Sequence, residues 1–193
     1  MHIVATYGDL RAGKDYIAEE LSRRLPEFIS YPTSLPIRRL LDALHTYEID
    51  SSDEDRKDAV RRPITQVSKA GHDAFGPDIW LDLSLRDARS QGVEGVALTG
   101  LRLADNLKAI HRHGGLNIWV EASRETIVQR YAAKGLVLTE ELYNNQWDNQ
   151  VRPYKADRAL MDLVVRNDGN AEETEADLRQ ALDKIKAHFS ILG

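Results

Sequence analysis

The sequence predicts an α/β fold in which five parallel strands form a sheet that is covered by helices on both faces, a three-layer α/β/α arrangement. Short apolar segments alternate with amphipathic helical segments along all 193 residues. The apolar segments are continuous, which is typical of strands buried on both faces. No repeat, low-complexity tract or linker interrupts this pattern, so we expect a single domain over residues 1–193.

The expected strands are His2–Thr6, Phe28–Tyr31, Gly95–Thr99, Leu116–Val120 and Met161–Arg166. Apolar residues that recur every three or four positions predict helices between them. These helices are Lys14–Leu25, Ser34–Leu44, Ile64–His72, Ile79–Ser90, Ala104–His113 and Ser123–Lys134. We expect a loop and then a helix in Thr46–Arg62, a turn in Gly71–Pro77 and a mostly polar helix in Thr139–Gln150. A last helix begins with a capping box formed by Asn170 and Glu173.

The composition excludes several classes of function. The chain has no cysteine, which removes disulfides, thiolate catalysis and Cys-type zinc sites. The net charge of -5 argues against a nucleic-acid polymer as partner. No signal peptide is evident, and no apolar run approaches the ~20 residues that a membrane span needs. We therefore expect a cytoplasmic protein without a membrane partner, and a homodimer is left open.

One short stretch, Gly8–Asp15 (GDLRAGKD), carries a specific chemistry. It has the phosphate-binding spacing G-x-x-x-x-G-K, and it follows an expected strand and opens an expected helix. The glycines let the backbone approach a phosphate closely, and the inward N–H groups, the helix N-terminus and the lysine attract it. We expect the loop to bind ATP through Gly8, Asp9, Leu10, Arg11, Ala12, Gly13, Lys14 and Asp15.

Asp15 stands where such loops usually have a Ser or Thr hydroxyl. A carboxylate in the first helical turn is stabilised by the helix dipole. The same carboxylate can also hold Mg²⁺, directly or through water. The sequence leaves both roles open.

The chain resembles the bacteriophage-type deoxynucleoside monophosphate kinases of the P-loop nucleoside monophosphate kinase superfamily. The resemblance begins with the G-K-D of the loop and continues through YPTSLPIRRLL, RRPI, GHDAFGPDIW, TGLR and VRNDG. It implies a P-loop NTPase fold and a reaction in which ATP, with Mg²⁺, phosphorylates a nucleotide. Gly100 departs from the family pattern, which has an acidic residue there. Because Gly100 ends an expected strand, we expect Gly100→Asp to be tolerated by the fold.

The resemblance also implies three functional regions. The core comprises about residues 1–31, 92–122 and 156–193, the acceptor-binding insert about 32–91 and the lid about 123–155. Catalytic roles are expected for Lys14, Arg102 and Arg130, and further contacts with ATP for Arg124 and Arg152. The acceptor nucleotide is expected to contact Arg38, Arg39, Arg62, Lys69, Trp80, Arg102 and Trp147.

Several of these residues have an alternative interpretation. The arginines outside the phosphate loop could equally lie on a solvated surface, and Trp80 could belong to the core. The leading hypothesis is a nucleoside or deoxynucleoside monophosphate kinase that uses ATP and a (d)NMP. One alternative is a small-molecule kinase of the phosphomevalonate or dephospho-coenzyme A kinase type. The other is a nucleotide-binding module that has lost catalysis, as the missing acid at Gly100 suggests.

Overall fold

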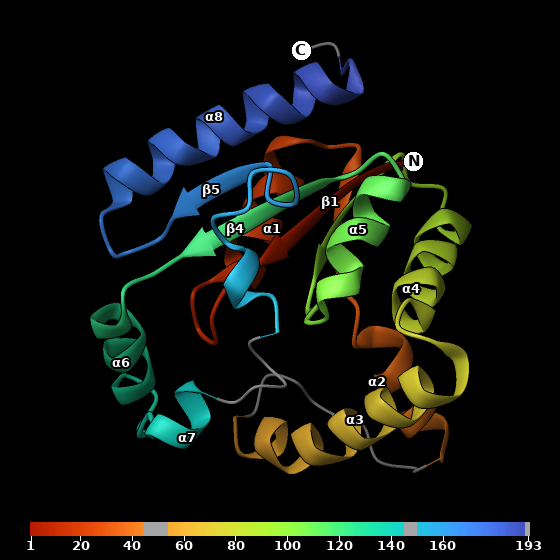
Figure 1. Cartoon of the computed structure of the whole chain (residues 1–193), viewed down its shortest axis with the longest axis vertical. Coiled ribbons are helices and arrows are strands. Elements are labelled where there is room, and N and C mark those ends of the chain that lie inside the picture. Colours follow the sequence, from red (N-terminus) through yellow and green to blue (C-terminus); the bar gives the residue numbers. More distant parts are fainter. Residues whose placement is uncertain (45–53, 145–149, 192–193) are drawn as a thin grey trace.

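The computed structural model describes residues 1–44, 54–144 and 150–191, except for the side chains of 44 and 54–62. Its centre is a five-stranded parallel sheet with the strand order β2-β3-β1-β4-β5 (Figure 1). The strands are β1 (His2–Tyr7), β2 (Phe28–Pro32), β3 (Gly95–Thr99), β4 (Leu116–Glu121) and β5 (Leu163–Arg166). All five expected strands are confirmed.

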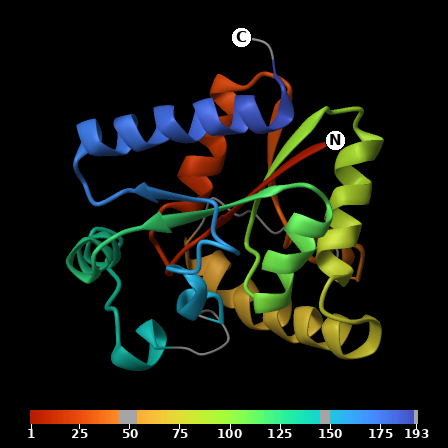
Figure 2. The same cartoon turned by 45° about the horizontal axis from the view of Figure 1, so that its top comes forward.

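Helices cover both faces of this sheet (Figures 1 and 2). On one face, α1 (Lys14–Arg24) and α8 (Ala171–Phe189) pack in a core that includes Val4 of β1. On the other face, α4 (Ile79–Ser90) and α5 (Ala104–Arg112) pack in a core that includes Ile3, Ala5 and Tyr7. Successive side chains of a strand point to opposite faces, so one apolar run supplies both cores. The three-layer α/β/α fold is thereby confirmed.

A smaller cluster lies between α2 (Leu35–Leu44), α3 (Glu54–Phe75) and α4. Its buried members are Ile37, Leu41 and Trp80, and Ile64 and Val67 of α3 pack against them. Because α4 also packs on the sheet, it connects this helical insert to the main core.

Two expectations about helix boundaries are wrong. Residues 54–75 form the single helix α3, which runs through Pro63, where two separate helical segments were expected. A Cβ atom at Gly71 would lie 2.3 Å from Cζ2 of Trp80, so close packing explains this glycine. The chain turns at Gly76, where φ is 94°, inside the stretch 71–77 in which a turn was expected. The expected helix at 139–150 is short: α7 spans Glu140–Tyr143, and residues 145–149 lie outside the described part.

Ser123 and Asn170 act as the helix N-caps that the sequence predicts. Ser123 Oγ accepts the N–H of Thr126 at the start of α6 (Arg124–Ala132). Asn170 Oδ1 accepts the N–H groups of Glu172 and Glu173 at the start of α8. A short 3₁₀ turn, η1 (Arg152–Tyr154), precedes β5. Among the described helices, none is both long and apolar enough to cross a membrane.

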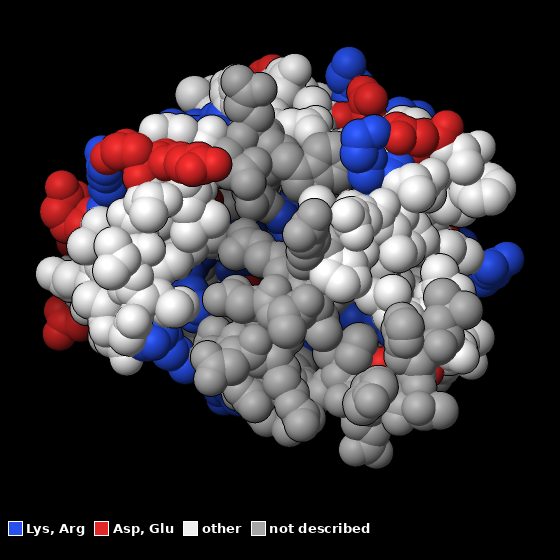
Figure 3. Space-filling view, turned by 90° about the horizontal axis from the view of Figure 1, so that it is seen from below, with Lys and Arg blue, Asp and Glu red and all other residues white. Residues whose placement is uncertain are grey.

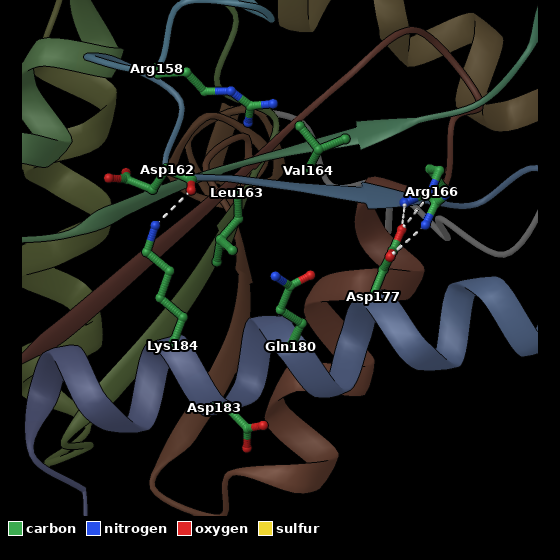
Figure 4. A pocket seen from close by; sticks show the side chains of 9 residues that line it. All are labelled: Arg158, Asp162, Leu163, Val164, Arg166, Asp177, Gln180, Asp183 and Lys184. Carbon is green, nitrogen blue, oxygen red and sulfur yellow. Dashed lines mark hydrogen bonds and ion pairs between the residues drawn. The ribbon is translucent and has the colours of Figure 1, made fainter.

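The edge strand β5 is held by side chains of α8 (Figure 4). The Asp177 carboxylate accepts the backbone N–H and the Nε of Arg166, both at 2.9 Å, and Lys184 Nζ donates to the carbonyl of Asp162 at 2.7 Å. A strand at the edge of a sheet resists pairing with another strand when its backbone groups are already hydrogen-bonded and charged side chains lie along it. The bonds from Arg166 hold the pKa of the Asp177 carboxyl below its ordinary value.

We expect Asp177→Asn to lower the melting temperature at pH 7, because the ionised carboxylate holds β5 to α8. A depressed pKa stabilises the fold above the unfolded-state pKa of about 3.9, and this contribution is lost as the pH falls through the native pKa. The difference between wild type and variant should therefore shrink below about pH 4. Thermal denaturation from pH 7 to pH 3 measures it. The control is Asp183→Asn, because Asp183 of α8 lines the same surface pocket as Arg166 and Asp177. An equal difference at every pH would contradict this role.

Candidate functional site

The phosphate loop between β1 and α1 is pressed against the ends of two other strands. Gly8 has φ of 149°, and a Cβ atom there would lie 2.4 Å from the carbonyl oxygen of Val120 in β4. Gly13 has φ of 99°, and a Cβ atom there would lie 2.1 Å from Nδ2 of Asn167, just after β5. Both positions therefore require glycine.

Two side chains bind the carbonyl groups of the loop. Arg130 of α6 donates from Nη1 to the carbonyls of Arg11 and Ala12, each at 3.0 Å, and from Nη2 to that of Asn167 at 2.7 Å. Asn167 Nδ2 also donates to the carbonyl of Ala12 at 2.8 Å. Carbonyls bonded in this way leave the loop's N–H groups to bind an anion. Arg130 thus holds the loop, and its expected contact with the transferred phosphoryl group stays a prediction.

Lys14 opens α1, as the motif requires. Its ammonium donates to the carbonyls of Gly8 at 3.0 Å and Asp9 at 2.8 Å, so the charge lies over the loop. Thr6 Oγ1 donates to the carbonyl of Lys14 at 3.3 Å, which links the helix start to β1. Asp15 is exposed in the first turn of α1, where both roles expected for it require it to be.

Residues of the expected lid contact the loop. Arg152 Nε donates to the carboxylate of Asp9 at 2.7 Å, and Arg152 Nη2 donates to the carbonyl of Tyr143 at 3.0 Å. Arg124 forms an ion pair with Glu140. The structure thus brings Arg152 to the loop and places Arg124 beside α7.

A second feature is a cavity of about 100 Å³ at the carboxyl end of β3, the strand that pairs with β1. In the register of the parallel pair β1–β3, Ala5 lies opposite Leu98, so the loops after these strands leave the sheet side by side. The cavity is lined by Thr33, Ser34, Ile37, Ile64, Thr65, Ser68, His72, Pro77, Trp80, Leu81, Gly100, Leu101, Arg102, Leu103 and Asn106. In the view from below, Lys and Arg atoms are visible in several recesses near the middle of the face, and most Asp and Glu atoms lie toward its left and upper edges (Figure 3).

The cavity wall formed by α3 is polar. Thr65, Ser68 and His72 line it at positions i, i+3 and i+7 of one helix face. Burial lowers the pKa of His72, so its imidazole is neutral near pH 7. This polar stripe was not predicted, although its helical spacing is visible in the sequence. Asn167 was not predicted either, although it follows the last strand at the carboxyl edge, where parallel α/β sheets bind ligands.

The expected acceptor residues have different environments. Arg102 and Trp80 line the cavity, and Trp80 also donates from Nε1 to the carbonyl of Ser68 at 3.0 Å within the insert core. Arg38 is half-buried in α2. Arg39 pairs with Asp87 at 2.8 Å and Lys69 with Asp73 at 2.6 Å, and neither lines the cavity. The Arg62 side chain and Trp147 lie outside the described residues.

The expectation that an aspartate at position 100 fits the fold is wrong. Gly100 has φ of 84°, a conformation that L side chains rarely adopt. A Cβ atom there would also lie 3.2 Å from Oγ1 of Thr33. A side chain at this position is therefore strained, whatever its charge.

The described carboxylates limit how a metal ion can bind. Over residues 1–44, 54–144 and 150–191, no group of three or more His, Cys, Asp or Glu side chains gathers as a metal site. Mg²⁺ in phosphoryl-transfer sites usually has one or two carboxylates, with water and substrate phosphates as its other ligands. Asp15, exposed next to Lys14, suits such a site.

Comparison with known proteins finds similarity in structure. No protein-family model and no curated protein matches the sequence. A shikimate kinase from Bacteroides thetaiotaomicron shares 12% identity over 96% of this chain and 98% of its own, with a TM-score of 0.59. The protein TT1252 from Thermus thermophilus shares 21% over 99% and 98%, with a TM-score of 0.57. A gluconokinase from Sinorhizobium meliloti shares 14% over 99% and 98%, with a TM-score of 0.50. The chain therefore has the α/β/α fold seen in P-loop kinases.

Proposed function

We propose that this chain transfers a phosphoryl group from ATP to a nucleoside or deoxynucleoside monophosphate, giving the diphosphate and ADP. The observation that supports this most is the position of the cavity at the carboxyl end of β3, whose neighbour β1 leads into the phosphate loop. Ligands of parallel α/β sheets bind at this edge. Two polyanions bound side by side there would be placed for in-line transfer.

In this proposal each cation has a separate task. The loop N–H groups and Lys14 bind the donor phosphates, and Lys14 exchanges its bonds with the Gly8 and Asp9 carbonyls for phosphate oxygens. Arg102, in the cavity wall, neutralises charge between acceptor and transferred phosphoryl group. Arg130 keeps the loop carbonyls bonded. Asp15 would hold Mg²⁺, which neutralises charge on the phosphates when it is bound.

A second candidate is a small-molecule kinase of the phosphomevalonate or dephospho-coenzyme A kinase type. The cavity favours an acceptor as small as phosphomevalonate, because about 100 Å³ is less than the roughly 300–1,000 Å³ of ordinary ligand pockets. Among the described lining residues, Arg102 is the one permanent cation. If the acceptor is a nucleotide, helices α2 and α3 must therefore move outward to enlarge the cavity, or residues outside the described part of the chain must contact the acceptor.

Loss of catalysis is the weaker alternative. It depended on Gly100 replacing an acidic residue, but the backbone at this position requires glycine, with φ of 84°. The glycine therefore has a conformational reason that is independent of activity.

The direct test is a panel assay with ATP, Mg²⁺ and each common NMP and dNMP, with phosphomevalonate and dephospho-coenzyme A included, read by product formation. We expect one nucleotide group to be phosphorylated and Lys14→Ala to reduce the rate at least about a thousandfold, because this charge is used in the transition state. A melting curve verifies that the variant is folded, because Lys14 bonds to the carbonyls of Gly8 and Asp9. Transfer only to a non-nucleotide acceptor would favour the second candidate. Wild-type rates in Lys14→Ala would reject the loop's role.

We expect Arg102→Ala to lower kcat roughly a hundredfold, the scale of one lost electrostatic contact in a closed site. The KM for ATP should change little, because Lys14 still holds the donor. Steady-state kinetics with each substrate varied in turn separates the two effects. Arg23→Ala, which removes an exposed arginine of α1, is the control. An unchanged kcat with a weakened ATP KM would place Arg102 at the donor.

Asp15→Asn distinguishes the two roles of this carboxylate. If it holds the metal, as we propose, the Mg²⁺ concentration for half-maximal rate should rise several-fold, because one anionic ligand is lost. Mg²⁺ titrations of the initial rate measure this, with Glu19→Gln one helical turn further on as control. A lower melting temperature with an unchanged Mg²⁺ requirement would show that Asp15 only stabilises the helix.

A further inference from the structure

Asp9 places a carboxylate inside the phosphate loop, directly after Gly8. Its side chain is only 15% exposed. Like charges repel more strongly where water is partly excluded. A loop that binds a polyanion would therefore lose affinity if Asp9 had no cationic partner.

Arg152 is the partner that the structure gives it. The distance from Nε to Oδ1 of Asp9 is 2.7 Å, and the Arg152 side chain is 27% exposed. Such short, charge-assisted bonds are about twice as strong as neutral ones. A residue of the expected lid, 143 positions along the chain, is thus fixed to the loop by the loop's own acid.

The same arginine is fixed on a second side. Its Nη2 donates to the carbonyl of Tyr143 at 3.0 Å, and its guanidinium carbon lies 4.6 Å from the centre of the Tyr143 ring. Arg124 lies 5.0 Å from the same ring centre and pairs with Glu140. These cation–π contacts and bonds join α6, α7 and the phosphate loop in one arrangement.

One part of the Arg152 guanidinium is left for a ligand. Nε and Nη2 are bonded as described, while Nη1 has no hydrogen-bond partner in the part of the chain that the structure describes. Because the guanidinium is planar, fixing two of its nitrogens also fixes the direction of the third. Nη1 is then a donor with a set orientation on a guanidinium that is bonded to the loop.

We propose that Asp9 is a positioning residue that holds Arg152 so that Nη1 binds the terminal phosphate of the donor, which makes the loop prefer a nucleoside triphosphate to a diphosphate. This rests on the proposed function and extends it, since ADP, the product, lacks the phosphate that Arg152 would bind. The acid in the loop then serves donor selection through an arginine from the lid.

The test is calorimetric titration with Mg²⁺ and either a nonhydrolysable ATP analogue or ADP. We expect Asp9→Asn to weaken binding of the analogue about tenfold or more and that of ADP less than about threefold, as loss of one oriented arginine contact predicts. Simple charge removal predicts the opposite, tighter binding of the triphosphate. Asp9→Glu should restore part of the affinity. Arg152→Ala should match Asp9→Asn, and the double variant should be no weaker than the weaker single variant.

Glu175→Gln, which breaks an arginine–carboxylate pair between α1 and α8, is the matched control and should leave both affinities unchanged. Melting curves verify that each variant is folded. The proposal would be overturned if Asp9→Asn bound the analogue as tightly as wild type or more tightly. It would also be overturned if the losses of affinity in Asp9→Asn and Arg152→Ala multiplied in the double variant. A wild type that binds the analogue but phosphorylates no acceptor refutes the proposed function and leaves this test valid. A wild type that binds neither nucleotide overturns both.

Discussion

The N–H groups of the phosphate loop can face an anion only if the carbonyl groups of Arg11 and Ala12 have hydrogen-bond donors on the other side of the loop. Arg130 and Asn167 provide these bonds, and they come from α6 and from the segment after β5. Gly8 and Gly13 allow the loop to lie against β4 and Asn167 at distances that a Cβ atom would prevent. The loop thus lies at the edge of the sheet where parallel strands β1, β4 and β5 end, the edge at which such sheets bind ligands.

The same edge explains where the cavity lies. β3 is the other neighbour of β1, and the segment that follows it, with Gly100 and Arg102, lines the cavity. Helices α2 and α3 also line this cavity, α3 with polar side chains, while Arg152 of the expected lid is bonded to Asp9 of the loop. A donor and an acceptor can therefore be held by different segments of one sheet edge, which is the arrangement that in-line transfer needs.

The sequence predicted the fold well because its signals are local. Continuous apolar runs gave the five strands, and the loop motif gave the position and neighbours of Lys14. The sequence did not show that one helix runs through Pro63, or that a contact with Trp80 requires Gly71, because neither follows from a local pattern. For the same reason Arg39 could not be assigned, because its partner Asp87 lies on another helix, whereas Lys69 pairs with Asp73 one turn further along α3. The positive φ of Gly100 is also a property of the folded turn.

The account's central claim is that the loop and the cavity are adjacent halves of one site, and a ligand that spans both tests it most directly. Calorimetric titration with a dinucleoside polyphosphate, which joins a donor and an acceptor nucleoside, should give one molecule bound per chain. Its affinity should exceed that of ADP by at least about tenfold, because linked groups bind two adjacent sites together. Lys14→Ala and Arg102→Ala should each weaken it. An affinity no higher than that of ADP, and unchanged by Arg102→Ala, would contradict the account.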